Sequence, residues 1–229
     1  MTISAGTSNN NSGNIQNITC SITGASATNR CALIGILNDG TPPSSVTFGA
    51  SACTLLASQG RLHLYRIIGQ PSGSQTVTAN QGAATNTIIG VAQFTADGTL
   101  SFGTAVTNTN TEETSLSVDV TSAAGQLVVD CAHLVVDSMT VGAGQSAIMN
   151  LPTGGSPPTG HDIGFLSFGM SYEAGAATTT MSWSGEFTVG DNDIIAVSII
   201  EEGGGGGATG RGRLIGGKLV GGNLLVRRL

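Results

Sequence analysis

The sequence contains little charge, few aromatic residues and almost no lysine. Charged residues make up 10% of its 229 residues, aromatic residues make up 4%, and Lys218 is the single lysine. Surface helices usually carry Glu, Lys and Arg at high density, so this composition excludes a fold built from long helices. Hydrophobic residues still reach 39%. That is enough apolar surface to offset the entropy of ordering, so a disordered chain is excluded as well.

Two kinds of targeting segment are also missing. Residues 1–14 are polar and contain no charged start followed by an apolar stretch, so we expect no secretory signal. No run approaches the roughly 18 consecutive apolar residues of a membrane helix, so we expect no membrane partner.

The four cysteines lack the paired, close spacings of zinc sites. Cys20, Cys31, Cys53 and Cys131 are far apart, and three of them lie inside strand-like runs. We interpret them as small buried hydrophobic residues that are kept as thiols. A disulfide between Cys20 and Cys31 is left open, because spacing alone does not decide it.

Short strand-like runs separated by turn residues fill most of the chain. Leu116, Val118 and Val120 alternate with Ser117 and Asp119, which is the pattern of a strand with one face in a core and one in water. Gly and Pro stand between the runs, as they do where a chain reverses. We predict strands at residues 15–22, 31–37, 45–48, 53–57, 61–68, 75–79, 87–94, 114–120, 126–135, 139–141, 146–151, 163–172, 177–183 and 193–200.

This pattern predicts an all-β fold. The spacing of the strands and turns favours a two-sheet antiparallel sandwich, of jelly-roll or Ig-like type, with an extended glycine-rich C-terminal arm. We predict three parts: a polar N-terminal segment at 1–14, a β-sandwich domain at 15–202, and a glycine hinge with a basic and apolar arm at 203–229.

Charge divides the chain in the same place. Residues 1–202 hold all fourteen acidic residues and three arginines, a net charge of −11, whereas residues 203–229 hold five basic residues and no acid, a net charge of +5. Nucleic-acid binding needs a basic surface, so nucleic acid is not expected as the ligand of the acidic body. The tail is basic but contains no aromatic residue for base stacking.

The tail combines a hinge with a regular apolar repeat. Residues 203–207 are five glycines, and five-residue units then begin at Leu214, Leu219 and Leu224. Paired glycines in these units exclude a stable helix, so we predict an extended arm that lays its apolar pairs against a neighbour. An inert, solubilising tail is the alternative, but it does not explain the repeat. The predicted docking residues are Arg211, Arg213, Leu214, Ile215, Lys218, Leu219, Val220, Leu224, Leu225, Val226, Arg227, Arg228 and Leu229.

No set of residues predicts catalysis. His63, His133 and His161 have no ligand spacing, and on a strand Asp130 would face away from Cys131 and His133. The triplet 191–193 offers side-chain oxygens to a calcium ion, but it also fits a turn before a strand, which we favour. We therefore predict no enzyme, no metal and no cofactor.

Several segments, in this order, resemble a β-sandwich module of tailed-bacteriophage virion proteins and related uncharacterised bacterial proteins. The matching segments are 29–36 (NRCALIGI), 45–49, 71–78, 125–130, 141–145, 177–183 and 195–199. The resemblance implies a jelly-roll or Ig-like sandwich without catalytic residues. The tail is similar to the short Gly, Leu and Arg endings of some phage virion proteins.

These observations together predict a non-enzymatic structural protein of a phage virion, in particular a capsid decoration or cement subunit that is anchored through its arm. The expected partners are other copies of the chain and virion proteins such as the major capsid protein. A tail or fibre-like appendage subunit is one alternative. A carbohydrate-binding surface adhesin is another, although a single tryptophan, Trp183, and two tyrosines are few for stacking on sugars.

Overall fold

The computed structural model of the protein describes residues 3–39, 41–111, 113–151, 166–187, 190–202, 214–215 and 218–219. Within these residues the chain forms antiparallel β-strands and no helix, which confirms the predicted all-β sandwich class. The strands are β1 (Ser4–Gly24), β2 (Asn29–Leu37), β3 (Ser45–Phe48), β4 (Ser51–Ala52), β5 (Thr54–Gln59), β6 (Leu62–Ile68), β7 (Gly73–Ala96), β8 (Thr99–Phe102), β9 (Val106–Thr111), β10 (Ser115–Thr121), β11 (Leu127–Val141), β12 (Ser146–Leu151), β13 (Leu166–Ala174), β14 (Thr178–Phe187), β15 (Asp191–Glu202), β16 (Leu214–Ile215) and β17 (Lys218–Leu219).

Three long strands each belong to two layers. Residues 4–15 of β1 pair with residues 85–95 of β7, whereas residues 17–24 of β1 pair with residues 73–80 of β7. The β1–β7 ribbon therefore folds over on itself. At the bend Gly82 has a φ of +77°, a conformation that glycine adopts without steric cost, and the Gly82 carbonyl accepts a hydrogen bond from the Gln16 side chain.

Strand β11 passes between layers in the same way. Its residues 127–135 pair with β13 and its residues 127–133 with β15, but after a register shift its residues 136–141 pair with β14. The shift lies between Val136 and Met139, where extra residues let the strand turn from one sheet into the next.

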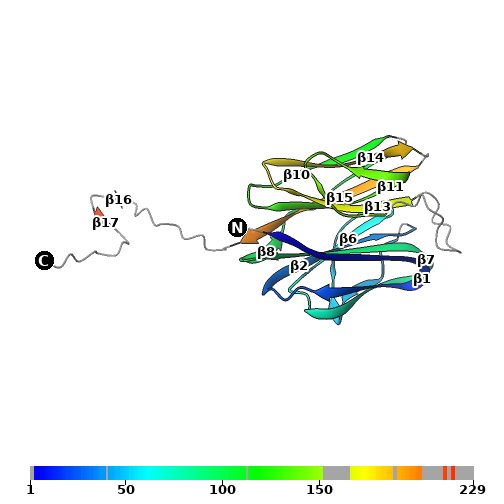
Figure 1. The fold of residues 1–229 in the computed structure, drawn as a ribbon, viewed down its shortest axis with the longest axis horizontal. Coiled ribbons are helices and arrows are strands. Elements are labelled where there is room, and N and C mark those ends of the chain that lie inside the picture. Colours follow the sequence, from blue (N-terminus) through cyan, green and yellow to red (C-terminus); the bar gives the residue numbers. More distant parts are fainter. Residues whose placement is uncertain are drawn as a thin grey trace.

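The body is a stack of four layers, seen edge-on in Figure 1. The N half (residues 3–96) forms two layers. The outer N layer contains β4, β3, the first half of β7 (residues 73–80) and the second half of β1 (residues 17–24). The inner N layer has the strand order β5-β6-β2-β7-β1 and contains the other halves of β7 and β1. The C half (residues 99–202) forms an inner C layer in the order β12-β13-β11-β15, with β8 and β9 at the edge of β15, and an outer C layer of β11, β14 and β10. The predicted sandwich is therefore present twice.

Three separate cores hold the layers together. Side chains such as Phe48 and Ile89 fill the N core between the two N layers, and Trp183 and Ile194 fill the C core between the two C layers. The central core, which includes Phe94, joins the inner N layer to the inner C layer. Complete burial of each such side chain stabilises the fold by roughly 1.5–3 kcal/mol.

The polar N-terminal segment belongs to the body. Residues 4–14 lie within β1 and pair with β7, so the expected boundary between residues 14 and 15 falls inside a strand. At the other end of the body β15 ends at Glu202. Residues 203–213, which include the predicted glycine hinge, lie outside the described residues.

A slot formed by two glycines fixes how closely the halves approach. Gly35 of β2 and Gly90 of β7 are directly paired, and the ring of Phe168 from β13 lies over both. A Cβ atom at Gly90 would come within 2.6 Å of that ring and 2.5 Å of the Met149 sulfur. Glycine is required here by close packing, since even one added methyl group forces the central core apart.

We expect Gly90→Ala to lower the free energy of unfolding by about 1–3 kcal/mol, because the added methyl group overlaps Phe168. Gly13→Ala is the matched control in the same sheet, where a Cβ would meet only the Ile15 side chain at 3.9 Å. Its effect is expected to stay within about 0.5 kcal/mol. Urea unfolding followed by tryptophan fluorescence measures both. Equal effects of the two substitutions would show that close packing against Phe168 does not require glycine at position 90.

Candidate functional site

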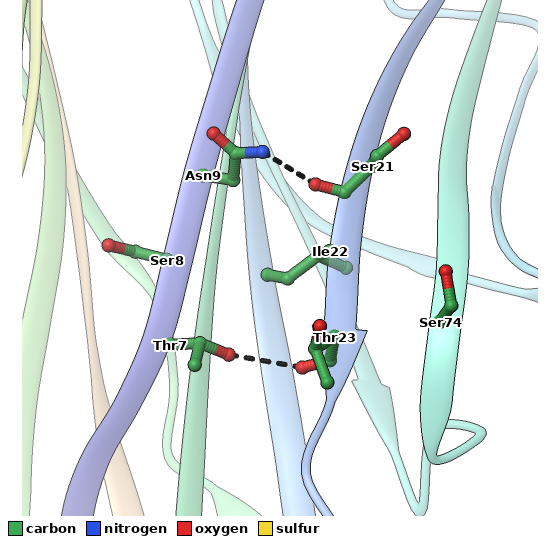
Figure 2. Close-up of a pocket in the computed structure, with 7 residues that line it drawn as sticks. All are labelled: Thr7, Ser8, Asn9, Ser21, Ile22, Thr23 and Ser74. Atoms are coloured by element: carbon green, nitrogen blue, oxygen red, sulfur yellow. Dashed lines mark hydrogen bonds between the residues drawn. The ribbon is translucent and has the colours of Figure 1, made fainter.

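An open polar groove lies between the two halves of β1, where the outer and inner N layers meet. Its volume is about 320 Å³. Figure 2 shows its lining residues, which come from β1 and β7 and carry no charge. They are Thr7, Ser8, Asn9, Ser21, Ile22, Thr23 and Ser74.

Side chains from the first half of β1 bridge this groove to the second half. Thr7 Oγ1 donates to the Thr23 carbonyl at 3.1 Å, and Asn9 Nδ2 donates to the Ser21 carbonyl at 2.6 Å (Figure 2). Gln93, a buried residue of β7, donates from its amide to Thr7 Oγ1 and to the Thr23 carbonyl. The side of the groove at Thr7 is thus tied to the sheet beneath it.

The asparagines close two sheet edges at once. Asn11 repeats the bridge, with Nδ2 donating to the Thr19 carbonyl at 2.7 Å. The side-chain oxygens of Asn9 and Asn11 accept from the backbone N–H groups of Asn10 and Ser12, both at 2.9 Å. Each side-chain amide therefore accepts, through its oxygen, from an N–H group of the inner layer and donates, through its nitrogen, to a carbonyl of the outer layer. We call the bridges made by Thr7, Asn9 and Asn11 the N seam.

The C half contains the same arrangement between β9 and β10. Asn108 Nδ2 donates to the Ser117 carbonyl at 2.8 Å, and Asn108 Oδ1 accepts from the Thr109 N–H at 2.9 Å. Asn110 Nδ2 donates to the Ser115 carbonyl at 2.6 Å. We call the bridges made by Asn108 and Asn110 the C seam.

The seams lie where the sheets end. In the described strands both halves of β1 pair only with β7, so their other side is a sheet edge. An uncovered edge offers N–H and carbonyl groups to any other strand and promotes aggregation. Because the asparagine amides occupy some of these groups, the seams protect the edges.

The sequence prediction missed the seams. It placed residues 9 and 11 in a polar segment outside the sandwich and predicted no strand at 106–111. The usable signal was Asn at every second position, in Asn9-Asn10-Asn11 and in Asn108-Thr109-Asn110. Residues two apart lie on one face of a strand, so this spacing aims both amides the same way.

A second polar cluster is buried in the C core around Asp130. This carboxylate accepts hydrogen bonds from Ser171 N–H (2.9 Å), Ser171 Oγ (2.8 Å), Trp183 Nε1 (2.9 Å) and Gln145 Nε2 (3.4 Å). The Gln145 oxygen in turn accepts from the Ser182 N–H. The cluster ties β11 and β13 of the inner C layer to β14 of the outer C layer.

Burial and hydrogen bonding act on Asp130 in opposite directions. Its complete burial disfavours the charged form and raises the pKa of the carboxyl from 3.8 to about 7, against the lowering effect of its four donors. Asp130 therefore exchanges its proton near neutral pH while the protein is folded. Cys131, next in sequence, belongs to the central core on the opposite face, as predicted.

Two of the three histidines, His63 and His133, are buried. His63 is buried and lies within hydrogen-bond distance of Ser58 Oγ (3.0 Å) and Asn38 Oδ1 (3.1 Å), and burial lowers its pKa to about 4. His133 is 1% exposed and burial lowers its pKa to about 4 as well. His161 lies outside the described residues.

All four cysteines are free thiols, so the Cys20–Cys31 disulfide left open above is not formed. Burial raises the pKa of Cys20 to about 11 and the pKa of Cys31 and Cys53 to about 12. A thiol is a poor nucleophile when its pKa is raised, because the thiolate is the reactive form.

The triplet at 191–193 is the start of β15, so the turn favoured from the sequence is wrong and the strand begins at Asp191. Asn192 is buried, donates to Asn110 Oδ1 at 3.0 Å and accepts from the Val135 N–H at 2.9 Å. Asp193 accepts from the Arg61 N–H at 3.2 Å. Among the described residues, no three His, Cys, Asp or Glu side chains come close enough to hold a metal ion.

Four of the predicted docking residues lie within the described part of the arm. Leu214 and Ile215 form β16, which pairs with Lys218 and Leu219 of β17. The other nine, which are Arg211, Arg213, Val220, Leu224, Leu225, Val226, Arg227, Arg228 and Leu229, lie outside it.

Comparison with protein-family models, with curated proteins and with solved structures finds no match to this chain. A search of the described residues finds no helix that is long and apolar enough to cross a membrane.

Replacing both Asn9 and Asn11 by Ala is expected to lower the free energy of unfolding by about 1–3 kcal/mol, because bridging bonds between the layers are lost. The freed edges are also expected to promote self-association, measured by gel filtration with light scattering. Asn10→Ala is the control, since its side chain makes none of these bonds. A double variant with the stability and the mass of the wild type would rule out a protective role.

The Asp130 carboxyl is expected to make the protein less stable as the pH rises from about 4 to about 7. Within this range the folded state holds a proton that the unfolded state has lost, so folding is favoured at the acid end. His63 and His133 act in the opposite direction, because their contribution is lost as the pH falls from 6.5 to about 4.

Comparison with Asp130→Asn isolates the carboxyl, because the histidines are common to both proteins. The stability advantage of the wild type over the variant is expected to shrink by about 1–3 kcal/mol between pH 5 and pH 7.5. Urea unfolding at both pH values measures it, with the exposed Asp119→Asn as the control. An advantage that does not change with pH would show that Asp130 stays ionised in the folded protein.

Proposed function

We propose that the protein is a non-enzymatic structural subunit of a tailed-phage virion, and that it decorates or cements the capsid through its C-terminal arm. The observation that carries this proposal is the contrast between body and arm. In its described residues the body packs its apolar faces into three cores and caps the edges formed by β1, β9 and β10 at the seams. The arm repeats apolar pairs every five residues and carries the opposite charge.

The body offers little apolar surface for binding. Within the described residues, the large hydrophobic side chains that are exposed are Ile15 (41%), Leu55 (42%) and Ile68 (47%). They lie on three different strands, β1, β5 and β6. Binding energy comes largely from apolar area that leaves water, at about 25 cal/mol per Å². Attachment to a particle therefore depends on the arm.

The arm is suited to this task. Leu214 and Ile215 pair with Leu219 and Lys218, so units of the repeat take up strand conformation. A strand-forming segment adds backbone hydrogen bonds to the burial of its side chains when it docks on a sheet edge or in a groove. Its charge of +5, against −11 for residues 1–202, favours an acidic acceptor, which a second copy of the body supplies.

Removal of residues 203–229 is expected to leave a folded body that no longer binds particles, since all three cores lie within residues 18–199. Labelled full-length chain and the 1–202 truncation would be incubated with virus particles purified from the source culture and pelleted together. A full-length variant carrying Leu219→Ser and Leu224→Ser keeps the positive charge of the arm and changes only its apolar repeat, so it separates the contribution of the apolar residues from that of the charge. Equal pelleting of the truncation and the full chain would overturn anchoring by the arm.

Copy number separates the capsid role from its nearest alternative. Quantitative mass spectrometry of the same particles is expected to find this chain in amounts near those of the main shell protein. A few copies per particle would identify a tail or fibre subunit instead. Complete absence from particles would overturn the virion proposal.

The N-seam groove favours a second candidate, a carbohydrate-binding surface module. The hydroxyl groups of its serines suit hydrogen bonding to a neutral sugar, although no aromatic ring lines it. Glycan-array binding by the 1–202 body that is lost in Ser21→Ala and Ser74→Ala variants would support this candidate over the first.

A further inference from the structure

The two halves of the body have the same strand order. The inner N layer runs β5-β6-β2-β7-β1, and the inner C layer runs β12-β13-β11-β15-β9. In the outer layers β3 corresponds to the end of β11, the first half of β7 corresponds to β14, and the second half of β1 corresponds to β10. Each half is therefore one complete sandwich of the same topology.

Irregular features recur at matching places. The pairing of β1 with β7 shifts between Ala5 and Ser8, around Gly6, and in the C half the matching edge breaks between β8 and β9, at residues 103–105. The N seam and the C seam also correspond, with Asn side chains of the inner edge bonded to carbonyls of the outer edge.

A short stretch of sequence also repeats at corresponding places. Residues 46–50 (VTFGA) correspond to residues 139–143 (MTVGA). The first begins in β3 and the second at the end of β11, and Val46 and Met139, the first residue of each, face the N core and the C core. A common topology, common irregularities and common sequence indicate an internal duplication.

The halves meet reciprocally across the central core. The β5 edge of the N half lies against β9 and β15, and the β1 edge lies against β12. Since β12 corresponds to β5, and β9 corresponds to β1, each half uses the same two edges to contact the other. A contact in which element i meets j, and j meets i, is the mark of a two-fold symmetric interface.

We propose that this chain is a fused dimer: the inner face of each half is a self-recognition surface, and the partner it fits is the other half of the same chain or of a second copy. The surface is complementary as well as large. Phe168 of the C half fits the slot at Gly35 and Gly90 of the N half, and Leu33, Phe94 and similar side chains fill the rest of the central core.

The connection between the halves is short and lies where both of them begin and end. Ser4 pairs with Thr95 at the limits of the N half, and Thr99 pairs with Glu202 at the limits of the C half. Only Asp97 and Gly98 separate β7 from β8. Recognition between the halves therefore does not depend on the order in which they are joined.

The first test cuts the connection in the full-length chain. A protease site inserted after the exposed Asp97 would be cleaved, and the two fragments are expected to stay together in gel filtration at the volume of the uncut protein. After two differently labelled cleaved samples are mixed and passed through mild denaturant, fragments of one sample are expected to pair with those of the other. Separation of the fragments after cleavage would overturn the proposal.

Phe168→Ala in the cleaved protein measures the recognition surface itself. Loss of the ring from the slot is expected to weaken binding between the fragments about a hundredfold or more. Ser8→Ala, at the exposed groove, is the matched control and is expected to change binding less than twofold. Equal binding in the two variants would show that this surface does not hold the halves.

A circular permutant gives an independent test that does not rely on a core substitution. It places residues 99–202 before residues 3–96 through a short flexible linker. It is expected to retain the near-UV circular dichroism of the parent and to melt within a few degrees of it. A permutant without tertiary structure would show that the order of the halves matters and would contradict a fused dimer.

Discussion

The structure depends on the burial of its two inner layers on both faces. In β2, odd-numbered side chains such as Leu33 fill the central core and even-numbered ones such as Ile34 fill the N core. In β15, Ile195 faces the central core and Ile194 the C core. A sheet with two apolar faces must be covered twice. The outer layers, the bends of β1, β7 and β11, and the close contact at Phe168 all follow from that requirement.

Covering a sheet by folding its own ribbon over creates a second problem, because the ribbon leaves an edge in each layer. Asparagine protects both of these edges, since one side-chain amide carries both a donor and an acceptor and reaches both edges. Charged edge residues would serve the same purpose. The exposed stretch of β1 contains none, and its residues are Ser, Thr, Asn, Ala and Gly up to Ile15. At this edge asparagine amides therefore provide the protection that charged residues would otherwise give.

Sequence patterns predicted well the strands that face a core. The predicted strands at 45–48 and 146–151 have the bounds of β3 and β12. Strand β7 was predicted as two strands, 75–79 and 87–94, because residues 80–86 have no apolar period, and the two segments pair with different halves of β1 on either side of the bend at Gly82. The first half of β1 was missed for the same reason. Its strand state comes from a partner far along the chain, which a local pattern does not record.

The body packs its apolar faces into its own cores and occupies edge groups at the seams. This affects how the chain can associate with other molecules. Association must overcome the loss of translational and rotational freedom, so it needs apolar area or unpaired backbone that a partner can cover. The inner faces are already matched to each other, and the seams occupy groups at the edges. What the body keeps free is a hydroxyl-rich, acidic surface, which favours solubility over adhesion. The apolar, basic sequence after residue 203 has the opposite properties, and the proposal of anchoring by the arm rests on this contrast.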